Sequence, residues 1–238
     1  MWMLLSMDEI KVPNLKGIKN NIVLCPECSA RLDTAKKLCV TTCPSCGISL
    51  YAPMLLNEYI LYKPLGSGGI GFVFKAHKEN DDGKKYAVKL SLRSCKNTDE
   101  TERQLMREAE TASAVGPHRN LVNFVEYGKD GDEFYVVFDF VDGERLDDFI
   151  ERKKHVSENR ALNIVNQIIV VEEYICSMGY LYRDLKPENI ILEKNGNLKI
   201  CDYGLCIPSK DAIIHDNIPD EIEGSPYCIP PERILGKS

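Results

Sequence analysis

The stretch that decides the fold of this chain is Leu65-Gly-Ser-Gly-Gly-Ile-Gly-Phe-Val-Phe74. Gly66, Gly68 and Gly71 form a G-x-G-x-x-G pattern, which in a dinucleotide-binding fold is followed directly by a helix. Here the third glycine is followed by β-forming residues instead. The stretch therefore predicts two strands joined by a glycine-rich loop, whose backbone N–H groups can approach phosphate because no side chains intervene.

The residues on either side of this loop extend the hairpin into a small antiparallel sheet. A strand pattern at 59–62 precedes the loop, and a turn signal at 80–83 leads to an apolar strand at 86–90. Two further strand patterns, 120–127 and 134–139, come after a helical stretch. The sequence therefore predicts a five-stranded sheet accompanied by one helix.

Lys89 lies in the middle of the apolar strand. A lysine at a strand edge, with its ammonium group reaching solvent, is the ordinary interpretation of such a residue. A buried ammonium group needs an anionic partner, and Glu108 on the following helical stretch is the natural counter-ion. Because the glycine-rich loop precedes it, we expect Lys89 to pair with Glu108.

A cluster of cysteines precedes the sheet. The pairs Cys25/Cys28 and Cys43/Cys46 are two C-x-x-C motifs separated by 14 residues. This spacing is typical of a tetrahedral Zn²⁺ site with four thiolate ligands, whereas a thioredoxin-like redox site has a single C-x-x-C near a βαβ pattern. The segment 20–50 resembles the zinc-ribbon family, which implies a structural zinc. We expect zinc loss to unfold this segment and to leave ligand binding at the glycine-rich loop nearly intact.

The sequence leaves the role of the ribbon open. Cys39, a fifth cysteine in the segment, is interpreted as a small buried residue, with a swapped zinc ligand as the alternative. Lys36 and Lys37 form only a small basic spot, and no aromatic residues are placed to stack on bases. Protein docking or a purely structural role is therefore favoured over nucleic-acid binding.

The composition of the whole chain limits its function further. The 238 residues contain 30 Lys+Arg and 36 Asp+Glu, a net charge of −6, which argues against a purely electrostatic nucleic-acid binder. No apolar run approaches the roughly 20 residues of a membrane-spanning helix, and no signal-peptide pattern is present. We therefore expect a cytoplasmic protein whose ten cysteines are metal ligands or buried thiols rather than disulfides.

The remaining motifs carry a resemblance to a known family. Tyr182-Arg-Asp-Leu-Lys-Pro-Glu-Asn189 stands where protein kinases have their H-R-D-x-x-x-x-N catalytic loop, and Asp202-Tyr-Gly204 where they have D-F-G. Gly224-Ser-Pro226 and Pro230-Pro-Glu232 match the end of the activation segment and the A-P-E motif. Over residues 58–238 the chain resembles the bacterial eukaryote-like (Hanks-type) Ser/Thr protein kinases.

Four features depart from the family pattern. Tyr182 replaces the histidine of the catalytic loop, Tyr203 replaces the phenylalanine of D-F-G, and Pro230 replaces an alanine. None of these changes removes a group that contacts phosphate, metal or the reacting hydroxyl, and both tyrosines can still stack in the core. The sequence also stops six residues after Glu232, whereas the family fold continues with further helices. We therefore expect a truncated product or a fragment.

The resemblance implies an α+β, protein-kinase-like fold of two lobes. The expected N-lobe, 58–141, carries the five-stranded antiparallel sheet. The expected C-lobe, 142–238, is helical and incomplete. The small zinc ribbon at 20–50 precedes both lobes.

The resemblance also implies an activity, which is that of a non-specific Ser/Thr protein kinase. Such an enzyme transfers the γ-phosphoryl group of ATP to serine or threonine hydroxyls of protein substrates. Asp184 would accept or orient the substrate hydroxyl proton, and Lys186 would stabilise the transferred group. Lys89 would neutralise the α- and β-phosphates, held in place by Glu108. Lys186 in its Asp-Leu-Lys-Pro-Glu-Asn context favours serine and threonine over tyrosine acceptors.

The cofactors that the resemblance implies are ATP and Mg²⁺, beside the structural Zn²⁺. Asn189 and Asp202 would supply oxygen ligands to Mg²⁺. The nucleotide would contact Leu65, Gly66, Gly68, Gly71, Val73, Ala87, Lys89, Asp139, Val141 and Ile191.

Two alternatives remain at this point. Because the C-terminal helices are missing, the chain could be a non-catalytic ATP-binding or scaffolding remnant. A second alternative makes the ribbon a nucleic-acid module, which the acidic balance of charge disfavours. We also expect Arg183 to pair with a permanent carboxylate at Glu221, where related kinases carry an activating phosphate.

Overall fold

The computed structural model describes residues 11, 22–33, 38–68, 71–91, 98–210, 227–229 and 231. Internal contacts divide the chain into two units, Met1–Lys96 with Gly128–Val137, and Asn97–Tyr127 with Phe138–Ser238.

The first unit begins with two small antiparallel hairpins. β1 (Ile22–Leu24) pairs with β2 (Arg31–Asp33), and β3 (Val40–Thr42) pairs with β4 (Ser49–Tyr51). The turn of each hairpin contains one C-x-x-C pair. This arrangement is compatible with the zinc ribbon that the cysteine spacing predicts.

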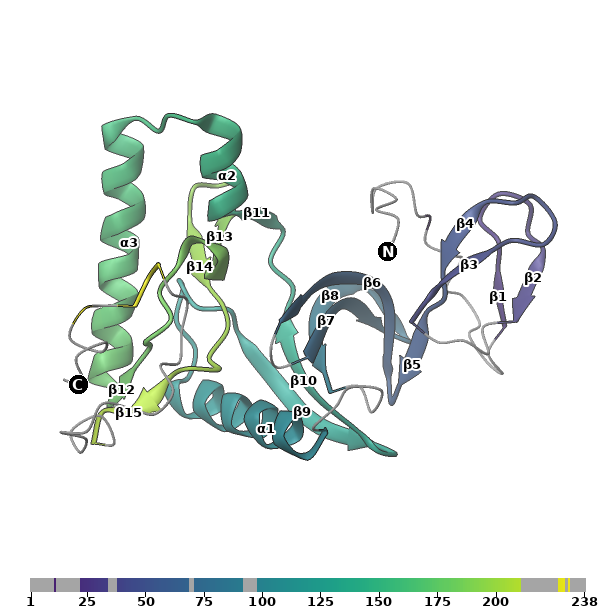
Figure 1. The fold of residues 1–238 in the computed structure, drawn as a ribbon, viewed down its shortest axis with the longest axis horizontal. Helices are drawn as coiled ribbons and strands as arrows, with labels where there is room; N and C mark the ends of the chain where they lie inside the picture. The colour runs from purple at the N-terminus through teal and green to yellow at the C-terminus, as the bar shows by residue number, and fades with distance from the viewer. Residues whose placement is uncertain are drawn as a thin grey trace. The chain divides into compact units, whose positions relative to one another are not determined.

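The main sheet has six strands rather than the expected five, in the order β5-β6-β7-β8-β10-β9 (Figure 1). Its central hairpin consists of β6 (Tyr59–Gly68) and β7 (Gly71–Lys78), followed by β8 (Asp81–Leu90). Two further strands follow a helix, as expected, namely β9 (Phe124–Asp130) and β10 (Glu133–Asp139). β9 begins later than the expected 120–127 and extends to Asp130.

The additional strand is β5 (Met54–Leu56), which lies where the sequence suggests only a linker. β5 pairs antiparallel with β6 through a two-residue turn at Asn57 and Glu58. Asn57 adopts a φ of +50°, a left-handed conformation that asparagine tolerates better than most residues. Its backbone N–H donates to Asp130 Oδ2 (2.8 Å), and its Nδ2 donates to the Tyr135 hydroxyl (2.7 Å).

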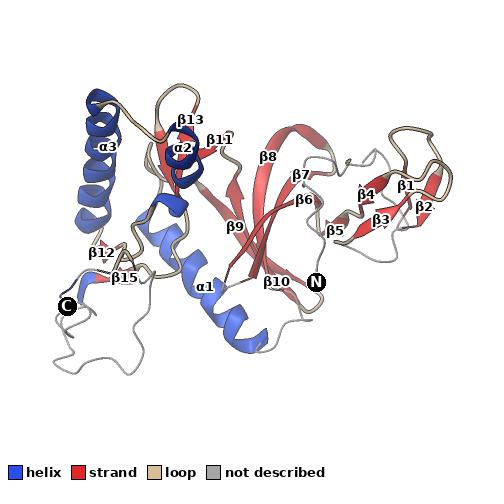
Figure 2. Ribbon diagram, turned by 45° about the horizontal axis from the view of Figure 1, so that its top comes forward, coloured by secondary structure: helices blue, strands red, loops and turns tan. Residues whose placement is uncertain are grey.

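The second unit contains all the helices that the structure describes over four or more residues, drawn in blue in Figure 2. α1 (Thr98–Val115) comes first, and α2 (Leu146–Lys153) and α3 (Glu158–Ser177) follow later in the chain. Ser157 precedes α3, and Gly179, at φ +80°, turns the chain just after it. The turn leads into β12 (Tyr180–Leu181).

Short strands in the second unit frame the catalytic-loop motif. β11 (Gly143–Arg145), β13 (Ile190–Glu193) and β14 (Leu198–Ile200) form a three-stranded sheet, and β12 pairs with β15 (Ile207–Pro208). The motif runs from β12 through the 3₁₀ turn Pro187–Asn189 into β13. The core beneath it consists of fully buried apolar side chains, Leu121, Val171, Ile175, Ile190, Leu198 and Ile200.

Among the residues that the structure describes, no helix combines the length and the apolar character needed to cross a membrane. Gly224–Pro226, Pro230, Glu232 and Glu221 lie outside the described residues, so the expectations attached to them stay predictions.

Candidate active site and candidate metal centre

The carboxylate of Asp184 is the centre of the catalytic-loop motif. It is buried, and its Oδ2 accepts a hydrogen bond from Asn189 Nδ2 (2.8 Å) and an ion pair from Lys186 Nζ (2.8 Å). Asn189 Nδ2 also donates to the backbone carbonyl of Asp184 (3.1 Å). Three residues that the sequence analysis singled out thus meet at one carboxylate, which fixes the orientation of that group.

The segment that contains Asp202 lies directly beside the catalytic loop. The amide of Cys201 donates to the carbonyl of Asn189 (2.9 Å), which joins the end of β14 to the catalytic loop. Asp202 itself has a φ of +69°, and its Oδ1 accepts from the amide of Gly204 (3.1 Å). The two expected Mg²⁺ ligands, Asn189 and Asp202, are therefore in neighbouring segments and offer the oxygen atoms that Mg²⁺ prefers.

The tyrosines that depart from the family pattern make hydrogen bonds that a histidine or phenylalanine could not make in the same way. Tyr182 is buried, and its hydroxyl donates to the carbonyl of Cys201 (2.5 Å), the residue before Asp202. Tyr203 is also buried, and its hydroxyl donates to the carbonyl of Val122 (3.2 Å). Burial raises the pKa of both phenols above its ordinary value, so both remain protonated donors at neutral pH.

Sequence reasoning expected these two rings only to stack, and it missed their hydroxyl groups. Stacking is present for Tyr203, whose ring lies parallel to Phe138 with centroids 6.2 Å apart. The missed signal was the phenol itself, because a buried hydroxyl usually finds an acceptor. Together the hydroxyls of Tyr182 and Tyr203 anchor the chain on either side of Asp202.

In the first unit, the glycine-rich hairpin pairs Gly66 with Val73 and Gly68 with Gly71. Gly71 has a φ of +120°, and a Cβ there would lie 2.6 Å from the carbonyl oxygen of Leu90. A Cβ on Gly66 would meet no atom within 4 Å. The third glycine is therefore required by the fold itself, whereas the first leaves an open space above the backbone.

Strand register brings the expected nucleotide residues of this unit to one face of the sheet. Val73 is opposite Lys89, and Ala87 is opposite Lys75, so that these four positions share a face. The intervening residues, such as Phe74 and Val88, are buried on the other face. Leu65 is exposed near the start of the loop.

The other expected nucleotide and ion-pair residues belong to the second unit. Asp139 ends β10, where its amide donates to the carbonyl of Asn123 (2.9 Å). Val141 and Ile191 are half-buried, and Ile191 lies on β13. Glu108 is buried on α1 and Lys89 on β8, in different units, so their ion pair stays a prediction.

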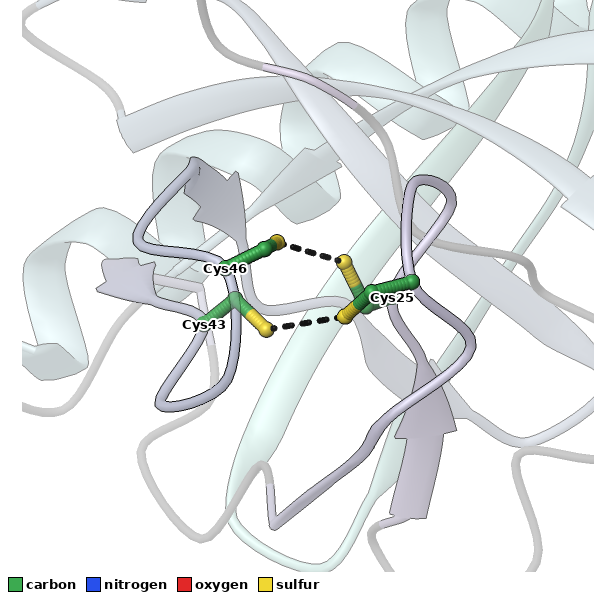
Figure 3. Close-up of side chains that lie close together, drawn as sticks. Cys25, Cys43 and Cys46 are labelled. Atoms are coloured by element: carbon green, nitrogen blue, oxygen red, sulfur yellow. Dashed lines mark hydrogen bonds between the residues drawn. The ribbon is translucent and has the colours of Figure 1, made fainter.

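The four ribbon cysteines converge on one point, and Figure 3 labels Cys25, Cys43 and Cys46 of this group. Their sulfur atoms all lie within 4.8 Å of one another, with Cys25 3.6 Å from Cys46 and Cys28 3.6 Å from Cys43. These separations exclude disulfides, whose sulfurs are about 2.05 Å apart. Four thiolates at about 2.3 Å from a tetrahedral Zn²⁺ would be about 3.8 Å apart, so the cluster fits this ion.

The two cysteine turns have the same backbone geometry. The amide of Cys25 donates to Ala30 and the amide of Cys43 to Ile48, both at 2.9 Å. The turns close at Ser29 and Gly47, which have φ values of +57° and +78°. Cys39 is half-buried, lies outside the group of four sulfurs and accepts through its carbonyl from Ala52 (2.7 Å).

The thiols of this group do not ionise alike. A backbone hydrogen bond from Cys46 is the main cause that lowers the pKa of Cys43 to about 6. A backbone bond from Ile48 favours the thiolate of Cys46, but burial and the neighbouring sulfurs outweigh it and raise the pKa of Cys46 to about 12. The thiolate of Cys43 therefore forms readily, and its negative charge opposes ionisation of the Cys46 thiol.

Most of this chain is similar to known proteins of one family. The model of the protein kinase domain matches residues 59–238. Serine/threonine-protein kinase PrkC of Bacillus subtilis (strain 168) is 29% identical over 188 residues, which cover 79% of this chain and 28% of that protein. CBL-interacting protein kinase 21 of Oryza sativa subsp. japonica is 31% identical over 188 residues, 77% of this chain and 34% of that protein.

A further bacterial relative is similar in the same region. Probable serine/threonine-protein kinase PknB of Lactococcus lactis subsp. lactis (strain IL1403) is 26% identical over 182 residues, 76% of this chain and 28% of that protein. The chain thus spans 34% or less of the length of these three relatives. The matched residues include both the glycine-rich hairpin and the catalytic loop around Asp184, and the chain belongs to the protein kinase family.

Proposed function

We propose that this chain carries the nucleotide-binding and catalytic-loop parts of a Ser/Thr protein kinase that transfers the γ-phosphoryl group of ATP to protein hydroxyls. The observation that supports this most strongly is the buried Asp184 carboxylate, held by Asn189 and Lys186 at 2.8 Å each. Phosphoryl transfer depends mainly on positioning and on charge neutralisation, and a fixed carboxylate beside a lysine serves both.

The proposed roles follow from residue type and place. Asp184 orients the acceptor hydroxyl and takes its proton, while the ammonium group of Lys186 stands beside the same carboxylate to stabilise the transferred group. The backbone at Gly66, Gly68 and Gly71 covers the phosphates of ATP. A serine or threonine acceptor is proposed from Lys186 and from the similarity to PrkC and PknB, which are named as serine/threonine-protein kinases.

Mg²⁺ would be held by Asn189 and Asp202, where it would neutralise phosphate charge. Lys89, supported by Glu108, would act on the α- and β-phosphates. Val73, Ala87 and Ile191 would enclose the adenine, with the backbone of Asp139 and Val141 at its edge.

Replacement of the central carboxylate tests this function. We expect Asp184→Asn to keep Mg·ATP binding and to lower phosphoryl transfer by at least about 100-fold, the usual size of a general-base contribution. Asp148→Asn, an exposed carboxylate on α2, is the matched control and should transfer phosphate at the parent rate. Equal transfer by Asp184→Asn and the parent would contradict the proposed role.

We also propose that Cys25, Cys28, Cys43 and Cys46 hold one structural Zn²⁺. The tetrahedral spacing of the sulfurs supports this assignment, and four protein ligands leave no open position for catalysis. Purified protein should contain about one zinc per chain, and Cys43→Ser should lose it, as measured by elemental analysis. Cys39→Ser is the control that should retain zinc. Unchanged zinc content in Cys43→Ser would contradict the four-cysteine assignment.

A further inference from the structure

The core of the ribbon is continuous with the strand that carries the glycine-rich loop. One cluster of buried side chains, each no more than 4% exposed, includes five ribbon residues and one residue of β6. Its members are Val23, Cys25, Leu32, Cys43, Leu50 and Ile60. Two of the proposed zinc ligands therefore pack in the same cluster as Ile60, the second residue of β6.

The segment between the ribbon and β6 is buried or paired over most of its length. Ala52 and Pro53 are buried after β4, and the carbonyl of Ala52 accepts from the amide of Leu38 (2.9 Å). β5 then pairs with β6 in a register that places Leu55 opposite Ile60, and Leu55 packs against the same cluster. The ribbon is thus attached to the sheet by the packing of Leu55 and Ile60 as well as by the chain.

Strand β6 connects this attachment to the phosphate-covering loop. Ile60 lies near its beginning, and Gly66 and Gly68 lie at its other end, paired with Val73 and Gly71. The strand has register shifts between Leu61 and Lys63 and between Pro64 and Gly66. Two such irregularities disrupt the backbone hydrogen bonds between β6 and β7, so the glycine end of β6 is less firmly fixed by strand pairing. Its position therefore depends on the packing around Ile60 at the other end of the strand.

We propose that Ile60 is a positioning residue through which the zinc site holds the glycine-rich strand in its ATP-binding position. The inference rests on the proposed zinc and ATP sites. Metal fixes the two cysteine turns against each other, and this closes the cluster on Ile60 and seats β5 against β6. Without metal, Cys25 and Cys43 no longer anchor the cluster, and β6 loses the packing at its base. The proposal differs from the expectation that zinc loss leaves nucleotide binding nearly intact, and an ATP titration of zinc-free protein decides between the two.

The first test compares zinc-loaded protein with protein treated with a zinc chelator and then freed of it. We expect the dissociation constant of a fluorescent ATP analogue, measured with excess Mg²⁺, to rise about fivefold after zinc removal, and re-addition of Zn²⁺ to restore it. Amide hydrogen exchange should accelerate in Tyr59–Gly68 in parallel. Unchanged ATP affinity in protein shown to have lost its zinc would overturn the proposal.

The second test changes the contact and leaves the metal ligands intact. Ile60→Ala should retain one zinc per chain and raise the dissociation constant of the ATP analogue about fivefold at a temperature well below its unfolding transition, where a purely stabilising residue would have no effect. Ile60→Val should recover most of the affinity. Val40→Ala, an exposed apolar residue on β3, is the matched control and should bind as the parent does.

The outcomes separate this inference from the proposals on which it rests. Parent protein that binds no zinc, or no ATP, contradicts the proposed function itself. Parent protein that binds both, combined with an Ile60→Ala variant of parent affinity, contradicts the coupling alone. If Ile60→Ala does not fold, Leu32→Ala opens the same cluster from the ribbon side and should give the same loss of ATP affinity with zinc retained.

Discussion

At the scale of single residues, the hydroxyl of Tyr182 is the feature that most directly affects the proposed metal site. The Tyr182 side chain is buried, its hydroxyl donates to the partly buried carbonyl of Cys201, and Asp202 is the next residue. Tyr182→Phe keeps the ring and leaves that carbonyl without this donor, which should lower the free energy of unfolding by about 1–3 kcal/mol. We expect phosphoryl transfer at saturating ATP to fall about tenfold, with a greater requirement for Mg²⁺. Tyr127→Phe, on an exposed ring, should change neither.

Gly66 and Gly71 of the hairpin give a second prediction at this scale, because only Gly71 is required by the fold. Gly71→Ala would place a Cβ against the carbonyl of Leu90 in a strained backbone conformation, so the free energy of unfolding should fall by about 2 kcal/mol. The new Cβ of Gly66→Ala meets no neighbouring atom, so the free energy of unfolding of this variant should lie within about 0.5 kcal/mol of that of the parent. Gly66→Ala should nevertheless weaken ATP binding, because the new methyl group obstructs the approach of the backbone to phosphate. Denaturant unfolding and ATP titration of both variants measure the difference.

At the scale of elements, helix α3 is apolar on more than one face. One face is buried and carries Ile164, Val171 and Ile175. A different set of apolar side chains on α3 is about half exposed, Leu162, Val165, Ile169 and Val170.

These exposed residues predict self-association of the 238-residue chain. Contiguous apolar surface of this kind promotes contact between copies. The double variant Leu162→Gln, Ile169→Gln should shift the protein toward monomer in light scattering and leave its thermal unfolding temperature nearly unchanged. The exposed pair Asn163→Ala, Asn166→Ala on the same helix is the control and should not alter association. A parent chain that is monomeric at high concentration would contradict the prediction.

The elements also show where sequence reasoning succeeded. Strong local patterns predicted the glycine-rich hairpin, the cysteine turns and the strands after α1, because each is specified by residues close together in the chain. β5 was missed because Met54–Leu56 is only three residues long, and its strand state depends on pairing with β6. The bond from Tyr182 to Cys201 joins positions 19 residues apart and likewise had no local signal.

At the scale of the whole molecule, the sequence identified the family but not the way its parts are joined. The motifs around Asp184 and Asp202 are sufficient for the family, and the match to the protein kinase domain over 59–238 supports it. The packing of Ile60 into the ribbon core could not be predicted, because it depends on contacts between residues that have no periodic relation. The ribbon and strands β5 to β8 fall in one unit of internal contacts.

The most direct test of the central claim is the identity of the amino acid that receives phosphate. The full chain in molar excess over γ-labelled ATP, with Mg²⁺ and a generic protein substrate, detects even slow transfer. We predict labelled phosphoserine and phosphothreonine that disappear in Asp184→Asn and persist in Asp148→Asn. Mg·ATP binding without any labelled product, or label on tyrosine alone, would contradict the assignment of this chain as a Ser/Thr protein kinase.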